Sequence, residues 1–311
     1  MVHHFRSTLN ILVATAMFFN YSGFSYAVDL PQVAGVVAGT ADFSTVGNTM
    51  NITASDQAII NYNQFNIGAQ NTVNFIQPSS TAVALNRVIG GQASSIYGAL
   101  NANGRIFLVN PNGILFAPGS RVDAAGLIAS TMGISNENFL NGNYSFERNG
   151  ANGSVNNQGQ IMIRNGGYLG LFAPEVRNSG SVLADMGTVM LASGEAATVS
   201  LDDNADVSVV VDPGQVTGIA NSGTIRADGG KVLLTAKSLN AIFDNAINNT
   251  GVIQANSLEG KNGEIYLTAN GRVNVDGTVS VLGGKVQVDS EGADYKGIIK
   301  AAQGIFNAHG G

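Results

Sequence analysis

The chain of 311 residues contains no cysteine. This absence excludes a disulfide framework, a thiolate metal site and a cysteine nucleophile. It is compatible with chance, and equally with a polypeptide that threads a narrow pore unfolded and therefore avoids cross-links. The sequence alone leaves both interpretations open.

Histidine and basic residues are also scarce. The histidines are His3, His4 and His309, two of them in an N-terminal leader and one near the last residue, so no Ser–His–Asp triad or histidine metal site can be assembled. There are 15 Lys and Arg residues against 21 Asp and Glu, and no lysine precedes Lys231. We therefore expect no nucleic-acid partner, because no basic stripe is available to neutralise a phosphate backbone.

Carboxylates are clustered at one place, where Asp202, Asp203 and Asp206 lie in a polar stretch between Leu201 and Val207. Paired carboxylates carry glycosidic-bond cleavage in many enzymes, but this turn-like context favours a solvated loop. We expect no catalytic residue, no cofactor and no metal site. A β-helical polysaccharide-active enzyme that uses these three residues remains the alternative.

Glycine and asparagine are abundant, with 40 Gly and 35 Asn in a chain that is 44% hydrophobic and only 12% charged. Both residue types tolerate positive φ and favour turns. Disordered chains combine low hydrophobicity with high net charge, and this chain has neither. The composition therefore predicts many short strands separated by tight turns.

Residues 1–27 have the pattern of a secretory signal peptide. Basic and histidine residues precede the apolar run Leu9–Phe19, and Ser25-Tyr26-Ala27 places small residues at the positions of a cleavage site after Ala27. The run is too short for a spanning helix, which needs about 20 residues. We expect an exported protein whose folded part begins near Val28.

Two short units recur in the second half of the chain. The first is Asn/Ser-x-Gly-x-Ile/Val, and it begins at Asn157, Asn178, Asn221 and Asn249. The second is glycine followed by alternating apolar residues, and it begins at Gly187, Gly230, Gly263 and Gly284. Gly159 and Gly180 are 21 residues apart, whereas Gly180 and Gly223 are 43 apart, close to two such steps. A shared period near 21 is typical of a solenoid built from short strands.

This period predicts an all-β fold, a parallel β-helix with about 21 residues per coil. Val, Ile and Leu would stack inside, and Asn and Gly would occupy the corners, where Asn side chains can form ladders. Roughly a dozen coils at about 4.8 Å each would give a rod about 50–60 Å long. A β-sandwich or barrel is the alternative, although it does not explain the period.

The two ends of such a helix are unpaired edges. We expect residues 28 to about 74, which lack the repeat, to supply an N-terminal cap within a domain that spans residues 28–200. Repeats continue over residues 201–311 and stop at Gly310-Gly311, where another strand would start. We therefore expect the protein to continue beyond this point, or the reading frame to be truncated.

The segment between Phe65 and Thr131 carries several distinctive pieces. In order they are Ala84-Leu85-Asn86-Arg87-Val88, Ser95-Ile96-Tyr97-Gly98, Asn101-Ala102-Asn103-Gly104, Asn110-Pro111-Asn112-Gly113-Ile114 and Leu127-Ile128-Ala129-Ser130-Thr131. This block resembles the N-terminal two-partner secretion (TpsA-type) domain of the filamentous haemagglutinin family. A second Asn-Pro-Asn-Leu motif of another branch is missing here, so the chain is most similar to the high-molecular-weight adhesin branch.

The resemblance implies a right-handed parallel β-helix and a cleaved signal peptide. It also implies export through the periplasm by an outer-membrane barrel with POTRA domains, which would bind this domain while it is extended. Folding would follow at the cell surface and yield a secreted exoprotein or adhesin. We expect it to be monomeric, with a host surface receptor or glycan as a further partner. A haem-binding or toxin-delivery exoprotein is the other alternative, with its payload beyond residue 311.

The resemblance assigns the secretion motif to Asn110, Pro111, Asn112, Gly113 and Ile114. Asn-Pro-Asn-Gly between two apolar runs is also a strong β-turn sequence, so the motif is either a structural corner or a signal that the transporter reads. Secondary motif residues are Asn86, Arg87, Val88, Asn101, Asn103 and Gly104. For Arg87, an exposed position beside a strand and a contact with the partner barrel both remain open.

Overall fold

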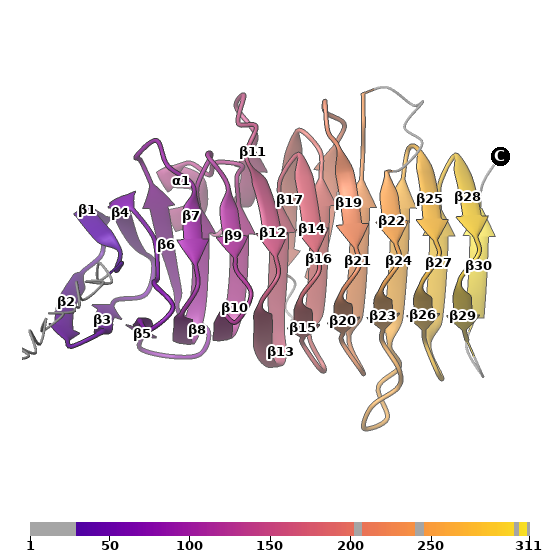
Figure 1. Cartoon of the computed structure of the whole chain (residues 1–311), viewed down its shortest axis with the longest axis horizontal. Helices are drawn as coiled ribbons and strands as arrows, with labels where there is room; N and C mark the ends of the chain where they lie inside the picture. The colour runs from indigo at the N-terminus through magenta and orange to yellow at the C-terminus, as the bar shows by residue number, and fades with distance from the viewer. Residues whose placement is uncertain (1–28, 202–206, 240–245, 302–304, 310–311) are drawn as a thin grey trace, which may run out of the picture.

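The computed structural model describes residues 29–201, 207–239, 246–301 and 305–309. The predicted leader with its cleavage site at Ala27, and the acidic residues Asp202, Asp203 and Asp206, lie outside the described residues. Within the described ranges the chain forms a rod of stacked coils, with strands running across the long axis (Figure 1). No helix in these ranges is long and apolar enough to cross a membrane.

Each regular coil contributes one strand to each of three faces. The first face contains β7 (Ser94–Ile96), β9 (Ile114–Phe116), β12 (Ser154–Asn157), β14 (Glu175–Asn178), β19 (Gly218–Asn221), β22 (Ile247–Asn249), β25 (Arg272–Val275) and β28 (Gly292–Tyr295). Three long strands, β8 (Ala99–Val109), β10 (Arg121–Ser130) and β13 (Gln160–Phe172), run from the second face onto the third.

The other two faces complete each coil. The second face also contains β3 (Thr49–Ala54), β5 (Thr72–Ile76), β15 (Ser181–Leu183), β20 (Thr224–Arg226), β23 (Val252–Gln254), β26 (Thr278–Ser280) and β29 (Ile298–Lys300). The third face also contains β4 (Ala58–Gln64), β6 (Val83–Val88), β16 (Thr188–Ser193), β21 (Lys231–Ala236), β24 (Glu264–Ala269), β27 (Lys285–Asp289) and β30 (Ile305–His309).

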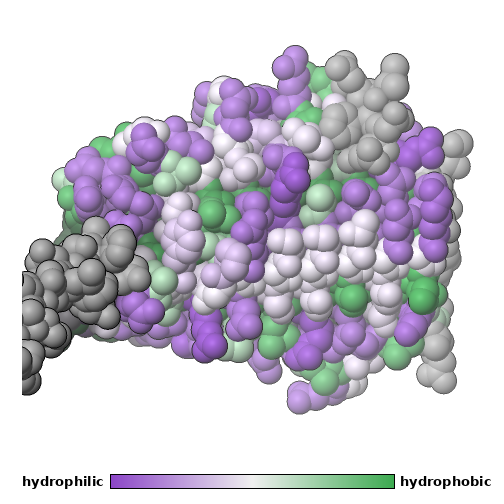
Figure 2. Space-filling model, viewed as in Figure 1, coloured by the Kyte–Doolittle hydropathy of each residue, from purple (hydrophilic) through white to green (hydrophobic). Residues whose placement is uncertain are grey.

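Side chains that point inward stack on their equivalents in the neighbouring coils. Val182, Ile225, Ile253 and Val279 are directly aligned across parallel strand pairs, and each is at most 1% exposed. Such columns remove apolar surface from water, which stabilises the fold by about 25 cal/mol per Å². On the face of the molecule shown in Figure 2, hydrophilic and intermediate residues dominate and the hydrophobic patches are small. The predicted parallel β-helix, right-handed and all-β, is confirmed, and the sandwich alternative is wrong.

The corner between the first and second faces is built from stacked glycines. A Cβ added to Gly223 would lie 2.1 Å from the carbonyl oxygen of Gly180 in the coil before. Gly251 meets Gly223 at the same 2.1 Å, and Gly277 meets Gly251 likewise. The repeated glycine is therefore required because backbones of adjacent coils approach too closely for any side chain.

The interpretation of the 43-residue spacing as two coils is wrong. Strand β15 pairs directly with β20, aligning Ser181 with Thr224, so Gly180 and Gly223 are one coil apart. The additional residues form an excursion containing the antiparallel strands β17 (Ala196–Leu201) and β18 (Val207–Asp212). Residues in such excursions do not form coils, so the chain has fewer coils than the dozen we predicted. The described second face has ten strands, and at about 4.8 Å per step the stack is about 43 Å long.

The N-terminal end carries an antiparallel cap. Strand β1 (Gln32–Ala38) pairs with β4, and β2 (Ala41–Val46) pairs with β3, both antiparallel. The parallel ladder already begins where β3 meets β5, within the segment for which we predicted a cap. At residue 200, where we predicted the end of the first domain, the stacking of coils continues without a break, because β15 pairs directly with β20.

A second hydrophobic core lies outside the helix, against the third face. It is covered by α1 (Asn136–Leu140), β11 (Tyr144–Glu147) and the β17–β18 hairpin, and we call these elements the cover. Phe107 of the third face contacts Phe139, Tyr144 and Phe146 of the cover with ring centroids 4.9–5.9 Å apart. Outward-pointing aromatic side chains of this face are thereby buried.

Candidate recognition motif at a corner of the helix

Residues Asn110–Gly113 form the corner that joins β8 to β9. The backbone N–H of Gly113 donates to the carbonyl oxygen of Asn110 at 3.1 Å, which closes a β-turn. The N–H of Asn112 donates to Oδ1 of Asn110 at 3.0 Å, and Gly113 has a φ of +122°, a conformation that favours glycine. The turn predicted from Asn-Pro-Asn-Gly is present.

Asn110 forms hydrogen bonds with both neighbouring coils, the one before it and the one after it. Its side chain is fully buried, and Nδ2 donates to the carbonyl oxygen of Gln92 and to Oγ of Ser94, both at 3.0 Å. Its backbone N–H donates to the carbonyl oxygen of Ser130, in the following coil, at 2.9 Å. Because buried polar groups are costly when unpaired, this full set of bonds ties Asn110 to one arrangement of the corner.

The motif divides into buried and exposed parts. Gly113 and Ile114 are buried with Asn110, whereas Pro111 and Asn112 are exposed. Even Asn112 is partly engaged, because its Nδ2 donates to the carbonyl oxygen of Gly90 at 2.9 Å. In the folded domain a partner could reach only Pro111 and the outer part of Asn112.

The Asn86-Arg87-Val88 piece belongs to β6 on the third face. Asn86 is buried and accepts a hydrogen bond from the hydroxyl of Tyr62 at 2.9 Å. Burial raises the pKa of this tyrosine far above its ordinary value. Val88 is 2% exposed and belongs to the interior.

Arg87 fastens the cover to the helix. Its guanidinium donates to the carbonyl oxygen of Ile134 at 2.7 Å and to Oδ1 of Asn136 at 2.9 Å. Ile134 and Asn136 flank Ser135, the residue that caps the N-terminus of α1. Partial burial lowers the pKa of Arg87. Two of the five N–H donors of this side chain are therefore used within the chain.

The Asn101-to-Gly104 piece lies at the bend of β8. Asn101 donates to Asn74 at 2.9 Å, and Asn74 donates to Asn51 at 2.9 Å, which makes a short ladder on the second face. Asn103 is exposed but exchanges two hydrogen bonds of 2.7 Å with the backbone of Gln77. A Cβ on Gly104 would lie 2.8 Å from the backbone carbonyl oxygen of Ala82, so this bend also requires glycine.

The motif residues do not converge on one surface. Asn101 lies on the second face, Arg87 on the third, and Asn110 at the corner leading to the first face. They share adjacent coils, because β6 and β5 both pair with β8. Sequence reasoning missed the partners Tyr62 and Gln77, whose roles depend on which coil lies next to them and leave no local signal.

The described residues contain no group of three His, Cys, Asp or Glu side chains placed to hold a metal ion. A shallow groove of about 530 Å³ on the second face is lined by residues that include Asn101, Arg121, Asp123 and Met162. Asp123 is the one carboxylate among the lining residues, and it lies 3.3 Å from Nε of Arg164.

Comparison with known proteins gives consistent matches. The profile of the TPS secretion domain family matches residues 28–295, a stretch that runs past residue 200. A heme/hemopexin-binding protein of Haemophilus influenzae is 37% identical over 262 residues, covering 80% of this chain and 28% of that protein. Another of the same name from the same species is 34% identical over 303 residues, covering 87% of this chain and 32% of that protein. The chain thus spans about a third or less of these relatives.

Solved structures match as well. The HMW1 secretion domain from Haemophilus influenzae superposes with a TM-score of 0.78 at 31% identity, covering 89% of this chain and 73% of that one. A filamentous hemagglutinin secretion domain superposes with a TM-score of 0.51 at 16% identity, covering 91% of this chain and 98% of that one. The second likeness is one of fold.

Proposed function

The chain belongs to the TPS secretion domain family, and from this premise we propose that it exports a longer exoprotein by being recognised before it folds. Proteins with this domain are secreted across the outer membrane by way of the periplasm. The proposed partner is an outer-membrane transporter whose POTRA domains bind the extended chain. The β-helix then forms at the cell surface.

The burial of Asn110 is the observation that carries this proposal. In the folded domain its side chain is inaccessible and all of its donors and acceptors have partners within the chain. Asn86, Val88 and Gly104 are buried too. If a transporter reads these residues, it must read them before the coils close, so the motif serves recognition in the extended chain and a structural corner afterwards.

The test compares Asn110→Ile with Asn112→Ile in cells that contain the cognate transporter. Asn110→Ile removes a buried network and places an apolar side chain at a polar corner, whereas Asn112 is exposed. Both should lower the secreted amount while periplasmic precursor stays detectable. Undiminished secretion of both variants would remove the motif from the recognition site.

Purified protein separates recognition from folding. POTRA domains should bind the urea-unfolded chain during dilution and fail to bind the refolded β-helix. The Asn112→Ile variant should refold, since its side chain is exposed and Oδ1 of Asn110 keeps the backbone N–H of residue 112 as a donor when the side-chain bond is lost. Equal binding of POTRA domains to folded and unfolded chain would contradict recognition before folding.

A second candidate function concerns the longer protein. Two relatives are named heme/hemopexin-binding proteins, which favours a heme- or hemopexin-binding exoprotein over a toxin-delivery one. Adhesion through a host receptor or glycan is the remaining proposal. Titration of hemin and of hemopexin against the full-length exoprotein and against this chain would show whether either binds and where.

We also propose that the chain is not an enzyme. The named relatives are secretion domains and heme-binding exoproteins. Activity on acidic polysaccharides that disappears in the Asp202→Asn, Asp203→Asn and Asp206→Asn variants would overturn this.

A further inference from the structure

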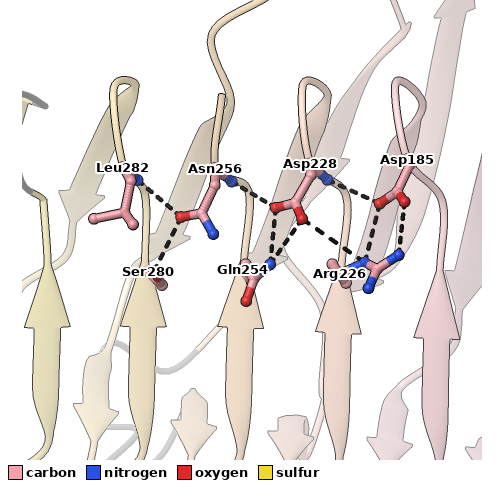
Figure 3. Close-up of polar contacts among 7 residues, drawn as sticks. All are labelled: Asp185, Arg226, Asp228, Gln254, Asn256, Ser280 and Leu282. Carbon is pink, nitrogen blue, oxygen red and sulfur yellow. Dashed lines mark hydrogen bonds and ion pairs between the residues drawn. The ribbon is translucent and has the colours of Figure 1, made fainter. Parts of the chain in front are cut away.

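A row of polar side chains runs along the corner between the second and third faces, from coil to coil. Asp185, Asp228, Asn256 and Leu282 each lie two residues beyond the end of a second-face strand, in four successive coils (Figure 3). An oxygen of each polar member accepts the backbone N–H of the next member. The distances are 3.2 Å from Asp228 to Asp185, 2.7 Å from Asn256 to Asp228 and 2.8 Å from Leu282 to Asn256.

Each step has a second donor, which is the last residue of the next second-face strand. Arg226 donates to Asp185 at 2.7 Å, and Gln254 donates to Asp228 at 2.7 Å. Ser280 donates to Asn256 at 3.0 Å. We call these residues and the corner residues the polar staircase. Leu282 has no side-chain acceptor, so the staircase ends there.

The three steps differ in chemistry. The first is an ion pair between a guanidinium and a carboxylate, the second joins an amide to a carboxylate, and the third joins a hydroxyl to an amide. Arg226 also lies 3.8 Å from the Asp228 carboxylate, so its charge is shared between two steps. Charge-assisted hydrogen bonds are roughly twice as strong as neutral ones.

Two other contacts, between the first three of these coils, are the same at each step. Asn157, Asn178, Asn221 and Asn249 form a buried ladder with bonds of 2.7–2.8 Å, and each coil places the same residue type in it. The glycine corner repeats in the same way. In a slipped pairing, β23 would pair with β15 and the coil between them would be looped out. Asn178 would then meet Asn249, and Gly180 would meet Gly251, so neither contact would oppose the slip.

We propose that the polar staircase is a register lock, which makes each coil pair with its own neighbour during folding. In the slipped pairing Asp185 would meet Gln254 and lose the guanidinium of Arg226, while Arg226 would lose the carboxylate of Asp185. The slip is worth preventing because chain entropy opposes it only weakly: Gly180 is 43 residues from its true partner Gly223 and 71 residues from Gly251, and the cost of closing a loop grows only with the logarithm of its length. This role concerns folding alone and does not depend on the proposed function.

The absence of cysteine makes the register directly measurable. Ser181 is aligned with Thr224 in the native register, and Ser181 would be aligned with Val252 in the slipped one. Aligned Cα atoms in adjacent strands lie about 4.8 Å apart, within the range of a disulfide, whereas two coil steps are about 9.6 Å. One purified chain would carry Ser181→Cys with Thr224→Cys, and another Ser181→Cys with Val252→Cys.

The experiment pulses an oxidant during refolding from urea and quantifies the cross-linked fraction. Arg226→Gln retains a donor for Asp185 but makes the first step chemically the same as the second, and Gln254→Arg makes the second donor the same as the first. Both substitutions should raise the slipped cross-link about threefold relative to the unmodified background, because each makes the donors of the first two steps the same.

The matched control is Arg164→Gln with Asp123→Asn, which removes an inter-coil ion pair of 3.3 Å between β10 and β13, two strands that stay paired in the slipped register. It should leave the slipped fraction unchanged. If Arg226→Gln and Gln254→Arg both leave the slipped cross-link at the control level, the staircase adds stability only and the proposal is wrong.

Discussion

Asn178 and Asn221 are 43 residues apart in the chain, and Nδ2 of the first donates to Oδ1 of the second at 2.7 Å. Both side chains are 1% exposed. They occupy the same position in adjacent coils, since β14 pairs with β19 and aligns the two residues. This contact explains why asparagine, rather than an aliphatic residue, begins the recurring Asn-x-Gly unit.

The first prediction concerns that ladder. Asn178→Ala leaves Asn157 without its acceptor and Asn221 without its donor, both in the interior. We expect the free energy of unfolding to fall by about 1–3 kcal/mol. Urea denaturation followed by circular dichroism measures this. Asn165→Ala, at an exposed position, is the control and should change stability by less than about 0.5 kcal/mol.

The second prediction concerns the stacked glycines. Gly223→Ala would place a methyl group 2.1 Å from the carbonyl oxygen of Gly180, so the two coils must separate. We expect a loss of about 1–3 kcal/mol or more in the free energy of unfolding. Gly91→Ala meets no atom within 4 Å and has no positive φ, so it should be neutral. Equal stability of the two variants would contradict the close approach of the coils.

The third prediction concerns the attachment of the cover. Arg87→Ala removes both hydrogen bonds that hold Ile134 and Asn136. Amide hydrogen exchange in residues 133–141 should accelerate roughly tenfold, because such bonds contribute about 1.5–3 kcal/mol when one group is charged. Lysine at this position should restore little, since it lacks the planar fork.

The control for Arg87 is Arg121→Ala, an exposed arginine on the second face. It should leave exchange in residues 133–141 unchanged. If Arg87→Ala also leaves that exchange unchanged while secretion falls, Arg87 acts on the transporter instead.

The fourth prediction concerns alkaline pH. Burial raises the pKa of Tyr62 above its ordinary value, so the unfolded chain loses this proton at a lower pH than the folded one. The free energy of unfolding therefore keeps the full contribution of Tyr62 below about pH 10. Above that pH the contribution declines, by up to about 1.4 kcal/mol per pH unit for one such group. Urea midpoints measured from pH 8.5 to 11.5 should show this decline.

Tyr62→Phe provides the check on that decline. It removes the ionisable hydroxyl and also its hydrogen bond to Asn86, so it should be less stable at pH 8. Its stability should then fall less steeply above pH 10 than that of the unmodified chain. An identical slope in both proteins would assign the alkaline loss to other groups.

Much of the β-helix could be predicted, because its stacking contacts join equivalent residues of neighbouring repeats. The 21-residue step from Gly159 to Gly180 places equivalent residues one coil apart, and their stacking needs no knowledge of the rest of the chain. The Asn-Pro-Asn-Gly turn was predictable for the same reason, since its bonds lie within four residues. The step from Gly180 to Gly223 was misjudged because the count of residues does not show which of them leave the coil.

The roles of individual motif residues could not be predicted. Arg87 reaches Ile134 and Asn136, 47 and 49 residues later, through a cover that only the folded chain assembles. The polar staircase was missed because its members, such as Asp185 and Arg226, are 41 residues apart and have no common spacing with the next pair.

The sequence by itself determined the fold class, the leader pattern, the corner residues and the family resemblance, because periodicity and turn chemistry are written in consecutive residues. Only the tertiary structure decided which coil lies beside which, which outward aromatic residues are buried under the cover, and that Asn110 is inaccessible. The physical reason is that each inter-coil contact depends on the length of chain that leaves the helix between two rungs, and no local pattern records that length.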